Sequence, residues 1–215
     1  YSHAMTYASL SNPSRDVVVL FGGNANYEYQ NDTWEWNGLQ WNLMNIAGNL
    51  PSPRFGHCLA YDSGRRKVVL FGGYGISRLN DTWEYDGVTW TRVYPTGNPA
   101  LPDPRYDAAM AYDPIRGEIV LFGGNCDDEA PRSSDTWVYK VTGTGATWSR
   151  KSPSTSPSDR MAAAMVFDYS RSVVLLHGGQ VGTPYGGSSN ETYEWNGSNW
   201  SRVSTSGPSI SWHSM

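Results

Sequence analysis

The chain has 215 residues, enough for one domain with a sizeable core or for an array of small repeats. Its 16 Lys and Arg against 20 Asp and Glu give a formal net charge of -4, which disfavours nucleic acid as a partner because nucleic acid attracts a basic surface. No apolar run approaches the roughly 20 residues of a membrane-spanning helix, so membrane insertion is not expected. The 10 Trp, 14 Tyr, 23 Gly and 13 Pro instead predict short strands joined by tight turns.

The chain contains two cysteines, Cys58 and Cys126. Two thiols supply neither a disulfide framework nor the spacing of a zinc site, so we expect both to be unpaired. The cysteine count leaves the redox compartment open.

An internal repeat organises the chain. Gly-Gly pairs begin at positions 22, 72, 123 and 178, in steps of 50, 51 and 55 residues, and an apolar run precedes each pair. Each pair is followed by a triplet of an acid, Thr and an aromatic residue, and then by a further tryptophan. The triplets are Asp32-Thr33-Trp34, Asp81-Thr82-Trp83, Asp135-Thr136-Trp137 and Glu191-Thr192-Tyr193, and the later tryptophans are Trp41, Trp90, Trp148 and Trp200.

Each repeat is predicted to form four short strands, named A to D in chain order. Strand A ends in an aromatic residue followed by Asp in three copies, strand B ends in Gly-Gly, strand C carries the triplet, and strand D carries the later tryptophan. Asn-Gly or Asp-Gly separates strands C and D in three copies, which is the strongest short signal for a hairpin. The predicted sheets span residues 1–46, 54–95, 105–151 and 160–204.

This order of features resembles the Kelch repeat, and the resemblance covers essentially the whole chain. It implies an all-β fold, a Kelch-type β-propeller, in which each repeat is a four-stranded blade with strand A lining a central channel and strand D outermost. The physical argument agrees, because one sheet of about 50 residues cannot cover both of its faces alone and radial stacking covers them. We expect the tryptophans to pack between blades and the Asp of each triplet to bond nearby backbone amides.

The two ends of the sequence match each other. Residues 1–5 align with residues 55–59, and so do residues 211–215. The sequence therefore predicts four blades plus the start of a fifth strand A at residues 209–215. The simplest interpretation is a segment of a larger propeller; a closed four-bladed ring and a ring completed by two copies are the alternatives.

The loops between strands B and C, at residues 24–31, 74–80, 125–134 and 180–190, vary while the strands around them repeat. Together with the loops between strands D and A, they are predicted to form one rim, and non-repeating loops are where binding specificity can be built. Rigid aromatic side chains on such loops suit the recognition of sugars or peptides. The candidates are Tyr27, Tyr29, Tyr74 and Tyr185.

Charged and imidazole side chains give further candidates. Arg54, Arg105 and Arg160 recur at the start of strand A, where they either form a ring of donors for carboxylate or sulfate or pair with an acid of a neighbouring blade. Asp127 and Asp128 lie in an acidic loop that is more typical of a solvated segment than of a Ca²⁺ site. The histidines at positions 3, 57 and 213 share one place on strand A, but Ala108 and Ala163 occupy it in two other copies, so no metal or other cofactor is expected.

The function predicted from these features is a non-catalytic module that binds a protein or a glycan through the rim. One alternative is the scaffold of a secreted carbohydrate-active or galactose-oxidase-like enzyme with its catalytic residues outside this segment. A second alternative is self-association through open propeller ends. The Trp-rich repeats and their Ser, Thr, Asn and Gly linkers look like those of bacterial secreted or surface proteins, so an extracellular or cell-surface location is expected.

Overall fold

The computed structural model describes residues 1–96, 100–126, 132–143, 145–182 and 186–212. They form four antiparallel sheets, each with four strands in chain order, which we call blades 1 to 4. Blade 1 contains β1 (Ala4–Ser11), β2 (Ser14–Ala25), β3 (Glu28–Trp36) and β4 (Trp41–Leu43), and blade 2 contains β5 (Cys58–Asp62), β6 (Lys67–Tyr74), β7 (Arg78–Tyr85) and β8 (Trp90–Val93). Blade 3 contains β9 (Ala109–Asp113), β10 (Glu118–Phe122), β11 (Thr136–Thr142) and β12 (Gly145–Lys151). Blade 4 contains β14 (Ala164–Asp168), β15 (Val173–His177), β17 (Thr192–Trp195) and β18 (Trp200–Ser204), and the short strands β13 (Arg160–Met161) and β16 (Gln180–Val181) pair beside it.

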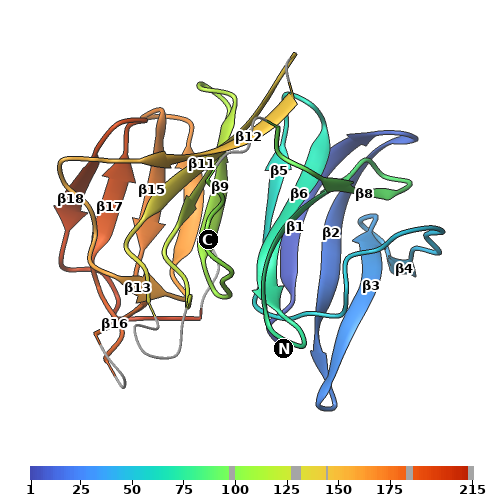
Figure 1. The fold of residues 1–215 in the computed structure, drawn as a ribbon, viewed down its shortest axis with the longest axis horizontal. Coiled ribbons are helices and arrows are strands. Elements are labelled where there is room, and N and C mark those ends of the chain that lie inside the picture. The colour runs from blue at the N-terminus through green and yellow to red at the C-terminus, as the bar shows by residue number, and fades with distance from the viewer. Residues whose placement is uncertain (97–99, 127–131, 144, 183–185, 213–215) are drawn as a thin grey trace.

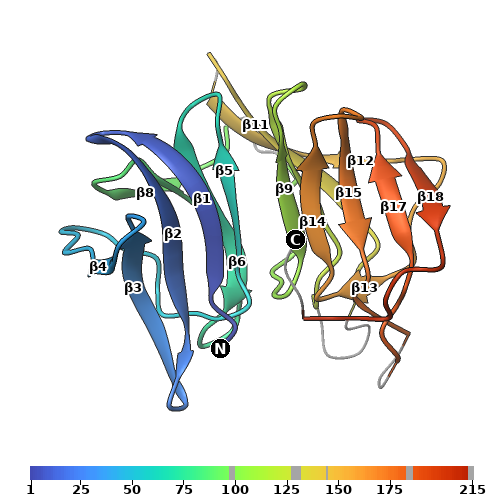
Figure 2. The same ribbon diagram turned by 180° about the vertical axis from the view of Figure 1, so that it is seen from behind.

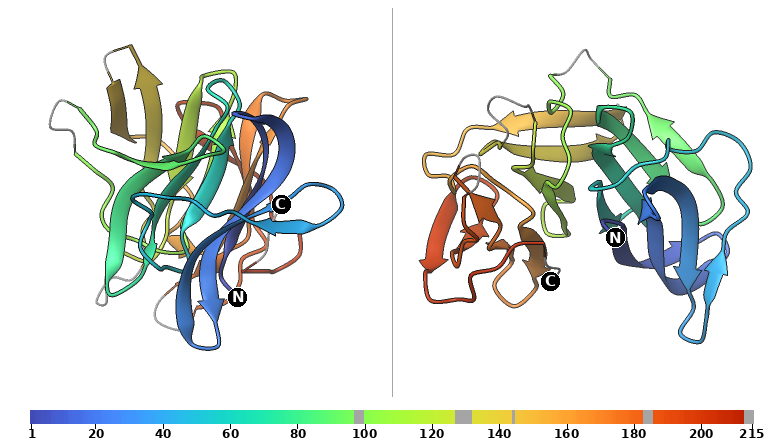
Figure 3. Two further views of the ribbon diagram at one scale, coloured as in Figure 1. Left: turned by 90° about the vertical axis from the view of Figure 1, so that its right-hand side faces the viewer. Right: turned by 90° about the horizontal axis from the view of Figure 1, so that it is seen from below.

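The blades follow one another along an open arc, which is clearest from below (Figure 3, right). The first strand of each blade lies on the inside of the arc: β5 contacts both β1 and β9, and β9 contacts β14 (Figures 1 and 2). This arrangement confirms the predicted all-β propeller architecture with strand A innermost. Within the part of the chain that the structure describes, no helix has the length and apolarity needed to cross a membrane.

The start of the predicted fifth strand A binds blade 4 without forming a strand in its described part, residues 209–212. The amide of Ile210 donates to the carbonyl oxygen of Ser189 at 3.1 Å, and the amide of Gly179 donates to that of Ile210 at 2.9 Å. The backbone of Arg160 makes the equivalent pair of bonds to blade 3. Residues 213–215 lie outside the described residues.

In blades 1 and 2 the expected loops between strands B and C are extensions of the strands themselves. The β2–β3 register shifts between Phe21 and Gly23, and the ladder then continues to Ala25, opposite Glu28. The β6–β7 ladder has the same shift between Phe71 and Gly73. Strand pairing resumes beyond this bulge. The regions 24–31 and 74–80, which were predicted to be loops, are therefore mostly paired strand that ends in a tight turn.

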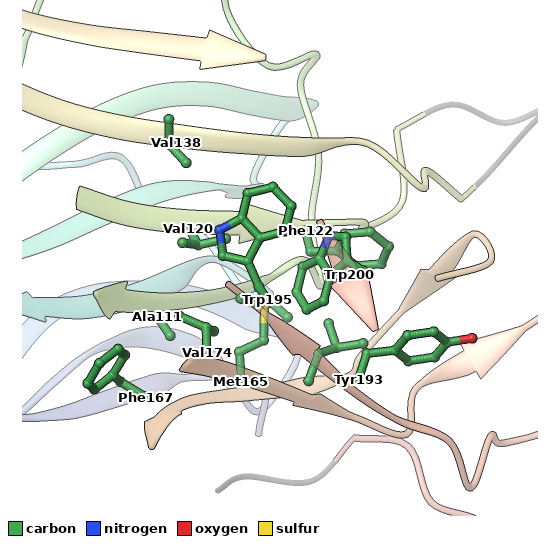
Figure 4. Packing of buried hydrophobic residues seen from close by; sticks show 12 residues of the cluster. Ala111, Val120, Phe122, Val138, Met165, Phe167, Val174, Tyr193, Trp195 and Trp200 are labelled. Carbon is green, nitrogen blue, oxygen red and sulfur yellow. The ribbon is translucent and has the colours of Figure 1, made fainter. Parts of the chain in front are cut away.

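Tryptophans lock neighbouring blades together, as predicted. The indole Nε1 atoms of Trp90, Trp148 and Trp200 each donate to the hydroxyl of the triplet threonine in the preceding blade, at 2.9, 3.0 and 2.9 Å. Apolar side chains from the facing sheets surround each indole, and Figure 4 shows Trp200 near Phe122 in the core between blades 3 and 4. Trp41 has no preceding blade in this structure and is 42% exposed.

Gly73→Ala is expected to destabilise the fold more than Gly38→Ala, although the two glycines have similar φ angles of 102° and 94°. A Cβ at Gly73 would lie 2.9 Å from the Cβ of His57 and 3.0 Å from the carbonyl oxygen of Phe55, whereas a Cβ at Gly38 would meet nothing within 4 Å. Both substitutions incur backbone strain of about 1–3 kcal/mol, and only the first adds an overpacking cost of about 1–3 kcal/mol. Urea denaturation of the two variants measures the difference; equal midpoints would contradict the close contact between Gly73 and the start of strand A in the same blade.

Candidate functional site

Four aromatic side chains from three blades gather on the rim where the first strands begin and the hairpins project, which is the face turned to the viewer in Figure 3, right. The ring of Phe55 lies 4.9 Å from that of Tyr29, 5.5 Å from that of Tyr74 and 5.9 Å from that of Tyr106, between centroids. Tyr74 and Tyr106 lie 5.6 Å apart in an edge-to-face arrangement. We call Tyr29, Phe55, Tyr74 and Tyr106 the aromatic cluster; Tyr29 is 38% exposed and the other three are partly buried.

Backbone bridges hold the aromatic cluster in place. Phe55 and Tyr74 exchange amide-to-carbonyl hydrogen bonds of 3.0 and 2.9 Å, and Tyr106 and Asn125 exchange bonds of 3.2 and 2.8 Å. The Arg78 guanidinium lies 5.7 Å from the centre of the Tyr106 ring and donates to Oδ1 of Asn125 at 3.2 and 3.0 Å. The cluster is therefore a rigid, amphipathic surface with a cation at its edge.

Two of the four predicted aromatic residues, Tyr29 and Tyr74, belong to this cluster. Tyr27 occupies the turn between β2 and β3 and is 93% exposed. Tyr185, Asp127 and Asp128 lie outside the described residues. Phe55 and Tyr106 were not among the predicted residues. The available signal was their position directly after the repeated arginine, which is aromatic in both copies.

The repeated arginines are buried supports of the blades. Arg54, Arg105 and Arg160 are each 1% exposed. Arg54 donates to both carboxylate oxygens of Asp81, at 2.6 and 2.8 Å, and to the carbonyl oxygen of Gly72 at 2.9 Å. The equivalent bonds of the other two reach Asp135 with Gly123 and Glu191 with Gly178. Such buried, engaged groups form no exposed ring of donors.

Two expectations about these residues need correction. Each acid belongs to the arginine's own blade, whereas a neighbouring blade was expected. The Asp of the triplet accepts from side chains rather than backbone amides: Asp81 bonds Arg54 and the indole of Trp83, at 2.7 Å. Burial opposes ionisation of Asp135, yet the hydrogen bonds and charge of Arg105 bring the pKa of Asp135 below its usual value. In blade 1, Oδ1 of Asp32 is buried and has no hydrogen-bond partner among the residues that the structure describes.

A series of backbone hydrogen bonds links consecutive repeats beside the aromatic cluster. Each amide donates to the equivalent carbonyl one repeat earlier, over 2.7–3.0 Å, and each residue has a left-handed φ of 54–61°. We call this series the inter-blade ladder; its members are Ser2, Gly56, Asp107, Ala162 and Trp212.

The inter-blade ladder borders a cavity of about 500 Å³ at the mouth of the channel. His3 and His57 both line this cavity, as their shared place on strand A predicts, with Ala108 and Ala163 continuing the wall. Burial lowers the pKa of His3 and lowers that of His57 to about 3, so both imidazoles are neutral at pH 7. The described residues contain no group of three or more His, Cys, Asp or Glu placed to hold a metal, and His213 lies outside them.

Three of the matches to known proteins are described here. The family model described as "KLHDC2/KLHL20/DRC7 Kelch-repeats domain" matches residues 2–215. Dynein regulatory complex subunit 7 of Chlamydomonas reinhardtii is 28% identical over 119 residues, which is 51% of this chain but only 10% of that protein's length. A solved structure described as "Structure of YjhT" aligns with a TM-score of 0.71 and 13% identity over 98% of this chain and 72% of that chain, a likeness of fold alone.

Proposed function

Since the chain belongs to the family of KLHDC2/KLHL20/DRC7 Kelch-repeat domains, we propose that it is a protein-binding module whose partner contacts the rim at the aromatic cluster. The observation that carries the proposal is the gathering of Tyr29, Phe55, Tyr74 and Tyr106 from three blades into one partly exposed surface. The proposal assigns no catalysis to this chain.

The chemistry of this surface suits a protein partner. Tyrosine and arginine are enriched among the residues that contribute most to protein interfaces. Tyrosine offers a large contact area with few rotatable bonds and a polar end, and arginine offers a planar cation with several hydrogen-bond donors. The backbone bridges of Phe55 and Tyr106 fix the rings before a partner arrives, which reduces the entropy lost on binding. The similar protein from Chlamydomonas reinhardtii is named as a subunit of a complex, which is consistent with a role in assembly.

Peptide selection tests the proposal. A displayed library of random peptides is panned against the chain, and the affinity of selected peptides is measured by fluorescence polarisation. We expect Tyr74→Ala and Tyr106→Ala each to weaken binding at least about tenfold, the size of an interface hot spot. Tyr169→Ala is the matched control, because this exposed tyrosine follows β14 at the other end of the blade.

Circular dichroism verifies that each variant remains folded. Peptides that bind the two cluster variants with unchanged affinity would contradict the proposal. The same conclusion would follow from a library that yields no binders, or from retention on a glycan array without binding of any peptide.

A further inference from the structure

Asp107 is a half-buried aspartate with one carboxylate oxygen that has no partner among the described residues. It lines the cavity at the channel mouth, and its Oδ2 is inaccessible and makes no hydrogen bond within the described part of the chain. Its Oδ1 lies 2.7 Å from where a Cβ on Gly56 would be, so the carboxylate rests against the glycine of the preceding blade. Burying an unpaired carboxylate oxygen costs free energy, so the presence of one at this position suggests that a ligand pairs with it.

The backbone does not explain why an acid stands here. Asp107 belongs to the inter-blade ladder, where a left-handed φ is required and aspartate is tolerated. The other members of the ladder adopt the same conformation with serine, glycine, alanine and tryptophan. The position therefore accepts neutral side chains, and the charge of Asp107 is a separate feature.

None of the titratable or charged groups around Asp107 in the described part of the chain pairs with its carboxylate. The neighbouring imidazoles of His3 and His57 are neutral at pH 7, and burial raises the pKa of the Cys58 thiol to about 12. Arg105 is two residues away but is paired with Asp135, and the amino group of Tyr1 donates to the carbonyl oxygen of Asn24 at 2.8 Å. Desolvation raises the pKa of Asp107 to about 7, as is typical of a carboxylate with no cation beside it.

Aromatic side chains border the same cavity. Trp212 is 57% exposed and lines it, and Tyr1 does so from the other end of the inter-blade ladder. A carboxylate together with an aromatic face is the combination that recognises organic cations, through an ion pair and a cation–π contact.

From this arrangement we propose that the channel-mouth cavity receives a cationic side chain of the protein partner, a lysine ammonium or an arginine guanidinium, with the Asp107 carboxylate as its acceptor. The inference rests on the proposed function, because the aromatic cluster contacts the partner's surface while the adjacent cavity takes its cation. Phe55 and Tyr106 of the cluster directly precede Gly56 and Asp107 in the chain, so cluster and cavity residues are neighbours along the chain.

A small lysine analogue tests the cavity directly. Nα-acetyl-lysine N-methylamide is titrated into the ¹⁵N-labelled chain, with the norleucine counterpart as a neutral probe of similar shape. We expect the lysine probe to shift the amide signals of Gly56, Asp107 and Ala162, and the norleucine probe to shift them at least about tenfold less at equal concentration. Since the ionised fraction of Asp107 rises from about one tenth at pH 6 to about nine tenths at pH 8, the Kd is expected to fall about tenfold over that range.

Asp107→Asn removes the charge and keeps a residue suited to a left-handed φ. It should abolish the shifts caused by the lysine probe, while Asp103→Asn, an exposed change in the same blade, should leave them intact. Because the pKa of Asp107 is raised in the folded state, Asp107 is protonated in the folded chain and ionised in the unfolded chain between about pH 4 and 7. The free energy of unfolding therefore declines as pH rises through that window. Asp107→Asn should therefore raise the Tm relative to the parent at pH 8 and do so less at pH 4.5.

Each other outcome overturns the inference. Equal shifts with the lysine and norleucine probes would show that charge is not recognised, and a lower Tm of Asp107→Asn at pH 8 would reveal a structural partner for the carboxylate. Absence of probe binding, alongside selected peptides that still depend on Tyr74 and Tyr106, would refute the cation site and leave the proposed function standing. The proposed function would fail separately, through peptides that ignore the aromatic cluster.

Discussion

Replacing Arg105 with alanine is expected to lower the free energy of unfolding by about 3–5 kcal/mol, because it leaves a buried carboxylate without its partner. The Arg105 guanidinium donates to both oxygens of Asp135, at 2.6 and 3.0 Å, and to the carbonyl oxygen of Gly123 at 2.8 Å. Its loss therefore removes from blade 3 an ion pair and the hydrogen bond to the first glycine of its Gly-Gly pair. Urea denaturation followed by tryptophan fluorescence measures the change.

Two further variants separate the charge from the packing. Arg150→Ala, an exposed position on β12 of the same blade, should change the unfolding free energy by less than about 0.5 kcal/mol. The double variant Arg105→Met with Asp135→Asn should be more stable than Arg105→Ala, because no unpaired charge then remains buried. A loss below about 1 kcal/mol for Arg105→Ala would refute the supporting role assigned to the repeated arginines.

Trp148→Ala is expected to have an effect of similar size, about 3–5 kcal/mol of unfolding free energy. The indole is buried between blades 2 and 3, with ring centroids 4.8 Å from Phe71 and 5.2 Å from Tyr139. Its Nε1 also donates to the hydroxyl of Thr82 at 3.0 Å. Alanine would leave a large cavity and an unpaired hydroxyl at the joint between blades.

Trp41→Ala is the matched control, since this tryptophan occupies the same place in blade 1 and is 42% exposed. It should lower the unfolding free energy by less than about 1 kcal/mol. Trp148→Phe should cost about 1–2 kcal/mol, because it retains most of the apolar area and loses the hydrogen bond. Equal losses for Trp148→Ala and Trp41→Ala would contradict the inter-blade packing.

The strand pattern was predictable because its causes are local. A glycine pair permits the bulge, alternation in the triplet sets which side chains face the next blade, and Asn-Gly or Asp-Gly turns the chain back. Thr82 and Glu84 lie on one face of β7, as that alternation requires. The fold could therefore be predicted from residues that recur.

The partners of repeated residues were not predictable in the same way. Arg54 and Asp81 recur with one period, so the spacing alone cannot tell whether an arginine meets the acid of its own blade or that of the next. The assembled structure decides, and it also brings Tyr29, Phe55 and Tyr106 from three blades together at the rim. The lack of a partner for the Asp107 carboxylate likewise depends on which residues surround it in the folded chain, and no sequence pattern predicts it.

The inter-blade ladder has a consequence for how the molecule opens. Its hydrogen bonds join only neighbouring repeats, so stability is nearly a sum of blade terms and nearest-neighbour terms, and cooperativity decays along the arc. Blades 1 and 4 each have one neighbour in this structure and should exchange their amide hydrogens through sub-global fraying, while blades 2 and 3 exchange close to the global limit. Because the aromatic cluster spans blades 1 to 3, a protein bound across it would stabilise blade 1 against local unfolding and slow its amide hydrogen exchange.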